Sequence, residues 1–136
     1  MTPFAPSAFL LVALGGALGA VLRHWVAALV ADRLRHAAFG TFAVNLSGAF
    51  LIGIAAASVF DPEIGMPASS TLWLLLVTGV LGSYTTVSSF SLQTLQLLRE
   101  HRVGAALANI AGSLTLCICA AAIGFALIYG FSVSNP

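Results

Sequence analysis

Four long apolar stretches in this chain of 136 residues constrain its fold more than any other feature. They run roughly from Ala8 to Val30, from Phe39 to Phe60, from Ser70 to Leu98 and from Val103 to Phe131. Each reaches or exceeds the ~20 residues that a helix needs to cross a ~30 Å hydrocarbon core. With 60% hydrophobic and only 7% charged residues, a chain this short could not hide its apolar surface from water. The sequence therefore predicts an all-α integral membrane protein, a single membrane domain over residues 1–136 with four transmembrane helices.

The first stretch has some features of a cleaved signal peptide. It is longer than the apolar region of such peptides, it lacks a basic start, and it carries Arg23 and His24 near its end. We therefore expect it to remain in the protein as a membrane helix.

The charged residues limit the possible transport mechanisms. All four acids fall at the ends of the spans or in loops: Asp32, Asp61, Glu63 and Glu100. A proton-coupled exchanger of small ions or drugs generally needs an acid or His inside the membrane, so this class is disfavoured and stays as an alternative. Arg23 is the one charge within a predicted span, and it serves either as an anchor at the membrane surface or as a cation that attracts anions. No basic run indicates nucleic-acid binding.

Residues suited to enzyme chemistry are not arranged for it. The serines of the apolar stretches have no buried His or acid beside them that could activate a nucleophile. Cys117 and Cys119 are two residues apart, so they lie on different faces of a helix and lack metal-ligand spacing. The sequence indicates that the protein is not an enzyme.

Small residues recur at helical spacing. Gly15 and Gly19 are four residues apart, and Ser47, Gly48 and Ala49 form a second group. Such patterns let helix backbones approach closely, within one bundle or between subunits. Because four helices rarely enclose a polar pathway alone, we expect an oligomer.

Uncharged polar side chains occur deep within the predicted spans. An amide such as that of Asn45 is costly there unless it finds partners. Asn109 and Ser113 are separated by one helical turn and share a face. With Ser88 and Ser89 these side chains line one polar track, or they only hydrogen-bond neighbouring helices.

The third stretch contains "GSYTTVSSFS" at residues 82–91, with six Ser or Thr hydroxyls. As a continuous helix this stretch would be about 43 Å long and would overshoot the bilayer core. Gly79 and Gly82 weaken a helix, and the hydroxyls of Thr85 and Thr86 compete for backbone groups. Two structures remain open: a continuous helix whose hydroxyls bond to the preceding turn, and a helix broken near mid-membrane. A break would free carbonyls that must bind protein, water or a cation.

Three blocks together, "GGALGAVLRH" (15–24), "GTFAVNLSGAFLIG" (40–53) and "GVLGSYTTVSSFS" (79–91), resemble the signature blocks of the CrcB/Fluc fluoride channel family. The resemblance implies a passive F⁻ channel of the inner membrane that lowers cytoplasmic fluoride. It also implies an antiparallel, dual-topology dimer with two pores, a third helix broken near mid-membrane, and a structural Na⁺ held by the backbone carbonyls of Gly82 and Thr85. The residues expected to serve the ion are a vestibule Arg23 and a fluoride pathway of Asn45, Ser88, Ser89, Phe90, Asn109 and Ser113.

One position departs from the family pattern. Where the family reads "TTFSTF", this chain reads "TTVSSF", so Phe90 matches the second Phe and Val87 replaces the first. An aliphatic side chain has no positive ring edge to offer an anion. The change predicts altered conduction, or a subunit whose pores depend on a partner chain.

The basic residues are distributed unevenly between the two sides of the membrane. All five arginines belong to the side that holds the loops after the first and third spans: Arg23, Arg33, Arg35, Arg99 and Arg102. This bias favours one orientation, with both termini outside the cytoplasm, whereas an antiparallel homodimer needs both orientations. We expect either a homodimer or a heterodimer with an oppositely oriented paralogue. A non-conducting subunit of a heterodimeric complex is a further alternative.

Overall fold

The computed structural model describes residues 6–35, 37–59 and 71–134. The elements are α1 (Pro6–Leu34), α2 (Ala37–Val59), η1 (Trp73–Leu81), α3 (Gly82–Tyr84), α4 (Val87–Arg99) and α5 (Val103–Ser134), where η1 is π-helical. Four helical segments are long and apolar enough to cross a membrane, and η1, α3 and α4 together make the third. This confirms the prediction of an all-helical, multi-pass membrane protein. Asp61 and Glu63 lie outside the described residues.

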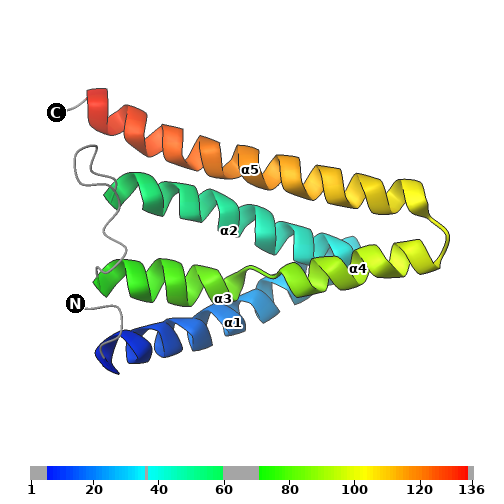
Figure 1. Cartoon of the computed structure of the whole chain (residues 1–136), viewed down its shortest axis with the longest axis horizontal. Helices are drawn as coiled ribbons and strands as arrows, with labels where there is room; N and C mark the ends of the chain where they lie inside the picture. Colours follow the sequence, from blue (N-terminus) through cyan, green and yellow to red (C-terminus); the bar gives the residue numbers. More distant parts are fainter. Residues whose placement is uncertain (1–5, 36, 60–70, 135–136) are drawn as a thin grey trace.

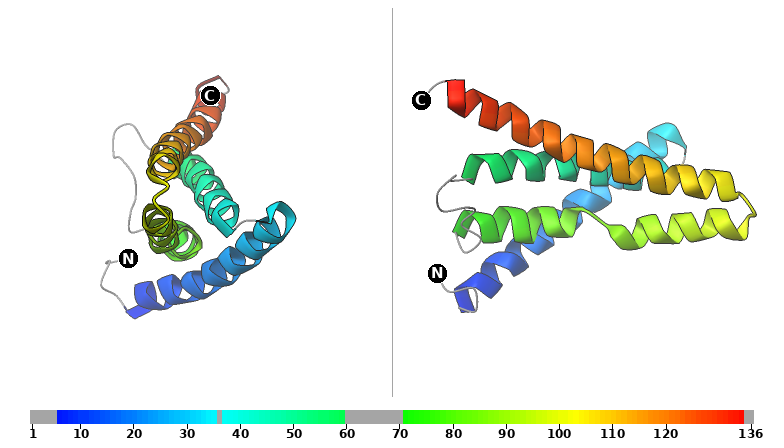
Figure 2. Two further views of the ribbon diagram at one scale, coloured as in Figure 1. Left: turned by 90° about the vertical axis from the view of Figure 1, so that its right-hand side faces the viewer. Right: turned by 45° about the horizontal axis from the view of Figure 1, so that its top comes forward.

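The four traverses run back and forth along the long axis of the molecule. The start of α1 and the end of α5 lie at one end, and the α1–α2 and α4–α5 connections lie at the other (Figure 1). α1 is steeply inclined to the other helices (Figure 2). Arg33 and Arg35 at the first connection and Arg99 and Arg102 at the second are exposed, so basic side chains gather at the connection end.

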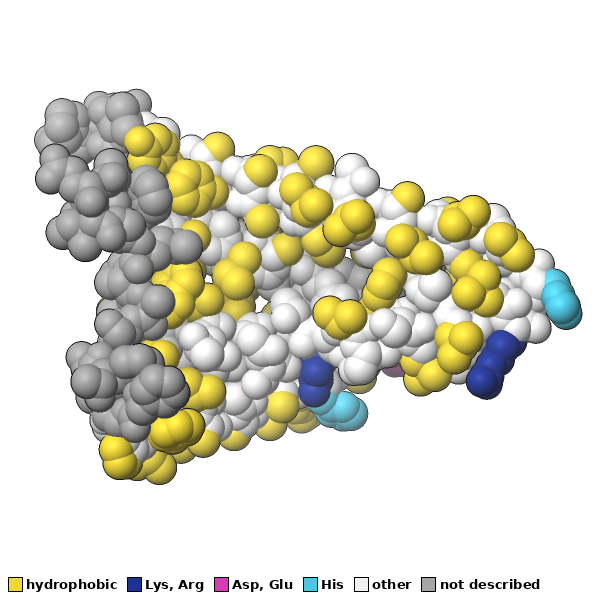
Figure 3. All heavy atoms as spheres, in the orientation of Figure 1, with side chains coloured by type: hydrophobic (Ala, Val, Ile, Leu, Met, Phe, Trp, Pro, Cys, Tyr) yellow, Lys and Arg dark blue, Asp and Glu magenta, His cyan; other side chains and the backbone are white. Residues whose placement is uncertain are grey.

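Many large apolar side chains lie on the outside of the bundle, and the most deeply buried of the described residues are smaller. Trp25 is 71% exposed and Ile118 is 60% exposed, whereas Val44 and Ala106 are fully buried at 0%. The space-filling view shows yellow apolar side chains along the length of the molecule, and dark-blue basic and cyan histidine side chains at few places (Figure 3). A surface of this kind suits hydrocarbon rather than water.

Glycines bring α1 against η1. A Cβ on Gly15 would meet the Leu75 carbonyl oxygen, and a Cβ on Gly19 would meet the Val80 carbonyl oxygen. On the facing helix, a Cβ on Gly79 would lie 2.9 Å from the Gly15 Cα. The two backbones therefore touch at positions where only glycine fits, which explains the spacing of Gly15 and Gly19 within a single chain.

A second glycine contact joins α2 to α5. A Cβ on Gly53 would meet the Ala121 carbonyl oxygen, and a Cβ on Gly124 would meet the Phe50 carbonyl oxygen. The two helices thus approach through reciprocal small residues, as α1 and η1 do.

The turn between α4 and α5 is closed by its own backbone. His101 takes the left-handed conformation, at φ 57°. Its N–H donates to the Leu98 carbonyl at 3.0 Å, and the Arg102 N–H donates to the Leu97 carbonyl at 2.9 Å. These are the two bonds of a Schellman motif, which ends α4 and turns the chain back into α5.

Candidate functional site

The backbone leaves the helical conformation between α3 and α4. Thr85 has φ −77° and ψ 158°, and Thr86 has φ −150° and ψ 118°, both extended. A helix that stops at Tyr84 leaves its last four carbonyls, those of residues 82–85, without intrahelical donors. Gly82 is exposed on the surface of the bundle. The segment therefore presents carbonyl oxygens in the middle of the third traverse.

Asn45 of α2 pairs with the Thr86 peptide. The Thr86 N–H donates to Asn45 Oδ1 at 2.7 Å, and Asn45 Nδ2 donates to the Thr86 carbonyl at 2.9 Å. The Thr86 N–H would have closed the helical bond to the Gly82 carbonyl had the helix continued. The side chain of α2 thus takes over a bond that the third traverse has given up.

The Thr86 hydroxyl caps α4. Its Oγ1 accepts from the Ser89 N–H at 3.3 Å, and it donates to Ser89 Oγ at 3.2 Å. Ser88 Oγ lies 3.1 Å from the same atom. A threonine in extended conformation whose oxygen accepts from the third residue along is a standard N-cap, so α4 begins at Val87 because of Thr86.

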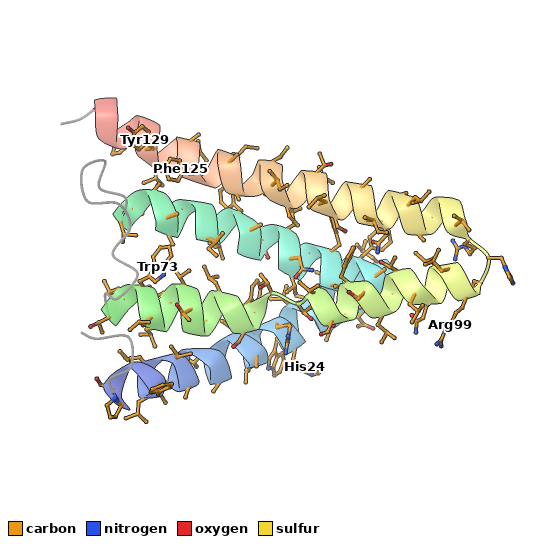
Figure 4. All side chains as sticks on the ribbon, in the orientation of Figure 1. His24, Trp73, Arg99, Phe125 and Tyr129 are labelled. Atoms are coloured by element: carbon orange, nitrogen blue, oxygen red, sulfur yellow. The ribbon has the colours of Figure 1, made fainter. Side chains whose placement is uncertain are left out.

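A groove with both polar and apolar walls opens between α1, α2 and α4. We call it the Arg23 groove; its volume is about 620 Å³. It is lined by Ala20, Arg23, His24, Ala27, Ala28, Ala31, Thr41, Val44, Thr86, Ser89, Leu92, Gln93 and Gln96. His24 extends from α1 and lines this groove (Figure 4). A half-buried guanidinium in a groove with uncharged polar walls attracts anions.

A mainly apolar groove lies between α2, α4 and α5. We call it the Phe90 groove; its volume is about 370 Å³. It is lined by Asn45, Gly48, Ala49, Ile52, Thr85, Thr86, Val87, Phe90, Ile110, Ser113, Leu114 and Cys117. Thr86 is 8% exposed and lines both grooves, so its peptide lies between them.

The structure distributes the expected pathway residues over several places. Asn45, Phe90 and Ser113 share the Phe90 groove, whereas Ser89 lines the Arg23 groove with Arg23. Ser88 is exposed beside the cap. Val87, at the position of the missing Phe, is 75% exposed at the edge of the Phe90 groove.

Asn109 hydrogen-bonds to a neighbouring helix and does not line the Phe90 groove. Its Nδ2 donates to Thr94 Oγ1 at 2.9 Å, and the Thr94 hydroxyl donates to the Phe90 carbonyl at 2.9 Å. With Ser113 it lines a separate cavity of about 190 Å³ against Phe39 and Phe42. Asn109 therefore anchors α5 to α4 next to Phe90.

Several side chains around the site were missed by the sequence reasoning. Gln93 Nε2 donates to the buried Thr41 Oγ1 at 2.7 Å, and the Tyr84 hydroxyl lies 2.9 Å from Ser47 Oγ. The sequence could have identified Gln93, because an amide within an apolar span needs a partner. It indicates Thr94 more weakly, because this residue lies one helical turn after Phe90 and so shares its helix face.

No carboxylate in the part of the chain that the structure describes lines either groove. Asp32 and Glu100 are exposed, Asp32 at the end of α1 and Glu100 directly after α4. Among the same residues, no group of three His, Cys, Asp or Glu side chains could hold a metal ion. A cation bound near Thr85 and Thr86 would therefore take backbone and hydroxyl oxygens.

Comparison with known proteins gives consistent matches over most of the chain. Residues 10–125 match the family model described as CrcB-like protein, Camphor Resistance (CrcB). The chain is similar to the fluoride-specific ion channel FluC 2 of Bradyrhizobium diazoefficiens, at 46% identity over 91% of this chain and 90% of the relative. It is also similar to the fluoride-specific ion channels FluC of Opitutus terrae (44% identity, 93% and 96% covered) and Rhizobium meliloti (42% identity, 88% and 94% covered).

Proposed function

This chain belongs to the CrcB-like protein family, and on that premise we propose that it is a fluoride-selective passive ion channel that lets F⁻ leave the cytoplasm. The observation that carries the proposal is the likeness to proteins named fluoride-specific ion channels, at 42–46% identity over 88–93% of the chain. A channel moves its ion without chemical change, so the protein is not an enzyme. Its four spans make it a multi-pass membrane protein, and we assign it to the inner membrane.

The chemistry of the two grooves suits a small, strongly hydrated anion. F⁻ loses its water only where hydrogen-bond donors replace it, and uncharged donors release the ion again. We assign this role to Asn45, Ser88, Ser89 and Ser113 around the Thr86 peptide. Arg23 draws the ion into the Arg23 groove, and the ring edge of Phe90 offers positive partial charge in the Phe90 groove. Asn109 contributes to the pathway indirectly, because its bond to Thr94 anchors α5 to α4 next to Phe90.

We further propose that the third traverse is broken near mid-membrane and that a second, antiparallel chain covers the break. The support is the extended backbone at Thr85 and Thr86 together with the exposure of Gly82. Irregular backbone does not face lipid, because its polar groups find no partners there. A partner chain across this face removes the conflict.

A structural Na⁺ fits the same place. The carbonyls of Gly82 and Thr85 are among the four that the end of α3 leaves without intrahelical donors. Oxygen atoms freed by an interrupted membrane helix are the ligands that Na⁺ takes. A bound Na⁺ would give these neutral carbonyl oxygens a partner at the seam between two chains.

Two features of this chain bear on the composition of the dimer. Val87 leaves one anion contact of the family pattern without an aromatic edge, and the arginines at the connection end favour one orientation. A homodimer is our first proposal. A heterodimer with an oppositely oriented paralogue, in which this chain alone does not conduct, is the second, and these two features favour it.

Fluoride efflux from liposomes tests the function directly. Purified chain reconstituted into vesicles is expected to release F⁻ when the membrane potential is clamped, to retain Cl⁻, and to need no pH gradient, as read with ion-selective electrodes. Efflux that requires a pH gradient would instead indicate the proton-coupled exchanger.

A second arm of the same experiment decides the composition of the dimer. If the purified chain releases no F⁻ alone but conducts after co-reconstitution with a paralogue, the result would favour the heterodimer. Vesicles that retain F⁻ with either composition would contradict the channel and leave the non-conducting subunit.

A further inference from the structure

The Thr86 peptide is bound as if by a neighbouring β-strand. Its N–H and its carbonyl both bond to the single side chain of Asn45, at 2.7 and 2.9 Å, although the two residues are 41 apart in the chain. Thr86 has extended dihedrals, as a strand residue has. Two residues of antiparallel strands exchange the same pair of bonds, and here a side-chain amide replaces one of the two backbones.

This pairing fixes the orientation of the Asn45 amide. A peptide N–H can only donate and a peptide carbonyl can only accept, so Oδ1 must lie on the N–H and Nδ2 on the carbonyl. The oxygen, which would repel an anion, is thereby engaged with Thr86. One N–H of Nδ2 remains, and Asn45 lines the Phe90 groove. This N–H is the group that Asn45 can offer to an anion in the Phe90 groove.

The same pairing determines where α4 begins. Thr86 is held through its backbone by Asn45 and caps α4 through its hydroxyl, which accepts from the Ser89 N–H at 3.3 Å. Gly48, nearly one turn after Asn45, lets α2 come close enough, because a Cβ there would meet the Thr85 methyl group. A displacement of Thr86 would therefore move Ser89 and Phe90 with it.

We propose that Asn45 and the Thr86 peptide form a clamp that holds the interruption of the third traverse, and that Asn45 is a positioning residue for ion passage. It sets the start of α4 and holds its own oxygen on the Thr86 N–H. The second half of this proposal rests on the proposed channel function; the clamp itself does not.

Amide hydrogen exchange at Thr86, in the full chain in detergent or nanodiscs, tests the clamp without any ion. In the unmodified protein the Thr86 N–H is expected to exchange more slowly than the Ser88 N–H, because a helix leaves its first-turn amides without intrahelical acceptors. Equal or faster exchange at Thr86 would overturn the clamp, and this comparison needs no variant.

Three variants sharpen the measurement. Asn45→Ala is expected to raise Thr86 exchange about tenfold or more, because the acceptor is lost. Gly48→Ala, which separates α2 from Thr85, is expected to raise it in the same direction. The matched control is Ser58→Ala on α2, whose exposed hydroxyl donates to the Ile54 carbonyl of its own helix at 2.9 Å; it should leave Thr86 exchange unchanged. Unchanged exchange in a folded Asn45→Ala protein would refute the clamp.

Asn45→Asp keeps the acceptor for the Thr86 N–H and removes both donors of the amide. A carboxylate still accepts from the Thr86 N–H, but it cannot donate to the Thr86 carbonyl or to an anion, and it repels anions. Thr86 exchange is expected to stay within about threefold of the unmodified protein, while F⁻ efflux falls at least tenfold. Wild-type efflux in Asn45→Asp or in Asn45→Ala would overturn the positioning role. If the unmodified protein releases no F⁻, the channel proposal fails and the exchange data still decide the clamp.

Discussion

The two halves of the third traverse are held in place by different means. η1 lies against α1 through backbone contacts at Gly15, Gly19 and Gly79, where no side chain fits between the helices. α4 is held by side-chain hydrogen bonds, from Gln93 to Thr41 of α2 and from Asn109 of α5 to Thr94. The sequences differ accordingly: "WLLLVTGVL" in η1 is apolar, whereas "VSSFSLQTLQLLR" in α4 alternates hydroxyls and amides with leucine.

This difference indicates a division of roles along one span. Close backbone packing is tight, but it does not orient polar side chains. Hydrogen bonds are directional, so they fix both the position of α4 and the rotation of the face that carries Ser89 and Phe90. The half that borders both grooves is the half that is held by directional bonds.

Gly19→Ala is expected to lower the stability most, because it disrupts the close backbone contact between α1 and η1. The new Cβ would meet the Val80 carbonyl oxygen, a backbone atom that cannot move alone. We expect the free energy of unfolding in detergent to fall by about 2–3 kcal/mol. The control Gly112→Ala has open space around the new Cβ and should gain about 0.5–1 kcal/mol instead. Equal effects at both sites would remove the distinction between packed and open glycines.

Thr94→Val is expected to have an intermediate effect, because it removes hydrogen bonds that hold α4. Valine keeps the shape of the buried threonine but removes the acceptor for Asn109 Nδ2 and the donor to the Phe90 carbonyl. A loss of about 1–2 kcal/mol in the free energy of unfolding is expected, with reduced F⁻ efflux because Phe90 loses an anchor. Thr94→Ser retains the hydroxyl and should restore most of both. A stable, fully conducting Thr94→Val protein would show that these bonds do not position α4.

Arg102→Ala gives the smallest effect and lies outside both halves. The Arg102–Glu100 ion pair in the α4–α5 turn is 3.3 Å long, and both side chains are about 60% exposed. Such pairs contribute little in water, so we expect the free energy of unfolding to change by less than about 0.5 kcal/mol. A change above about 1 kcal/mol would mean that this turn is held by charge rather than by its Schellman bonds.

Much of the fold could be predicted from the sequence, because membrane spans are a local property. Length and apolar composition suffice to identify four traverses, since only helices of that length satisfy their backbone in hydrocarbon. The spacing of Gly15 and Gly19 correctly indicates close helix packing. The resemblance of three sequence blocks to a known family is confirmed by the match over residues 10–125. The residues expected to serve the ion remain predictions.

Only the tertiary structure decided which polar groups meet. The sequence left open whether Asn45 and Asn109 line one track or hydrogen-bond neighbouring helices; in the structure one amide binds the Thr86 peptide and the other binds Thr94. The π-helical stretch of η1 and the sharing of Thr86 between two grooves had no sequence signal either. The physical reason is that span formation depends on residues near one another in the chain. A hydrogen bond across 41 residues depends on how helices cross and where a backbone turns aside, which no local pattern records.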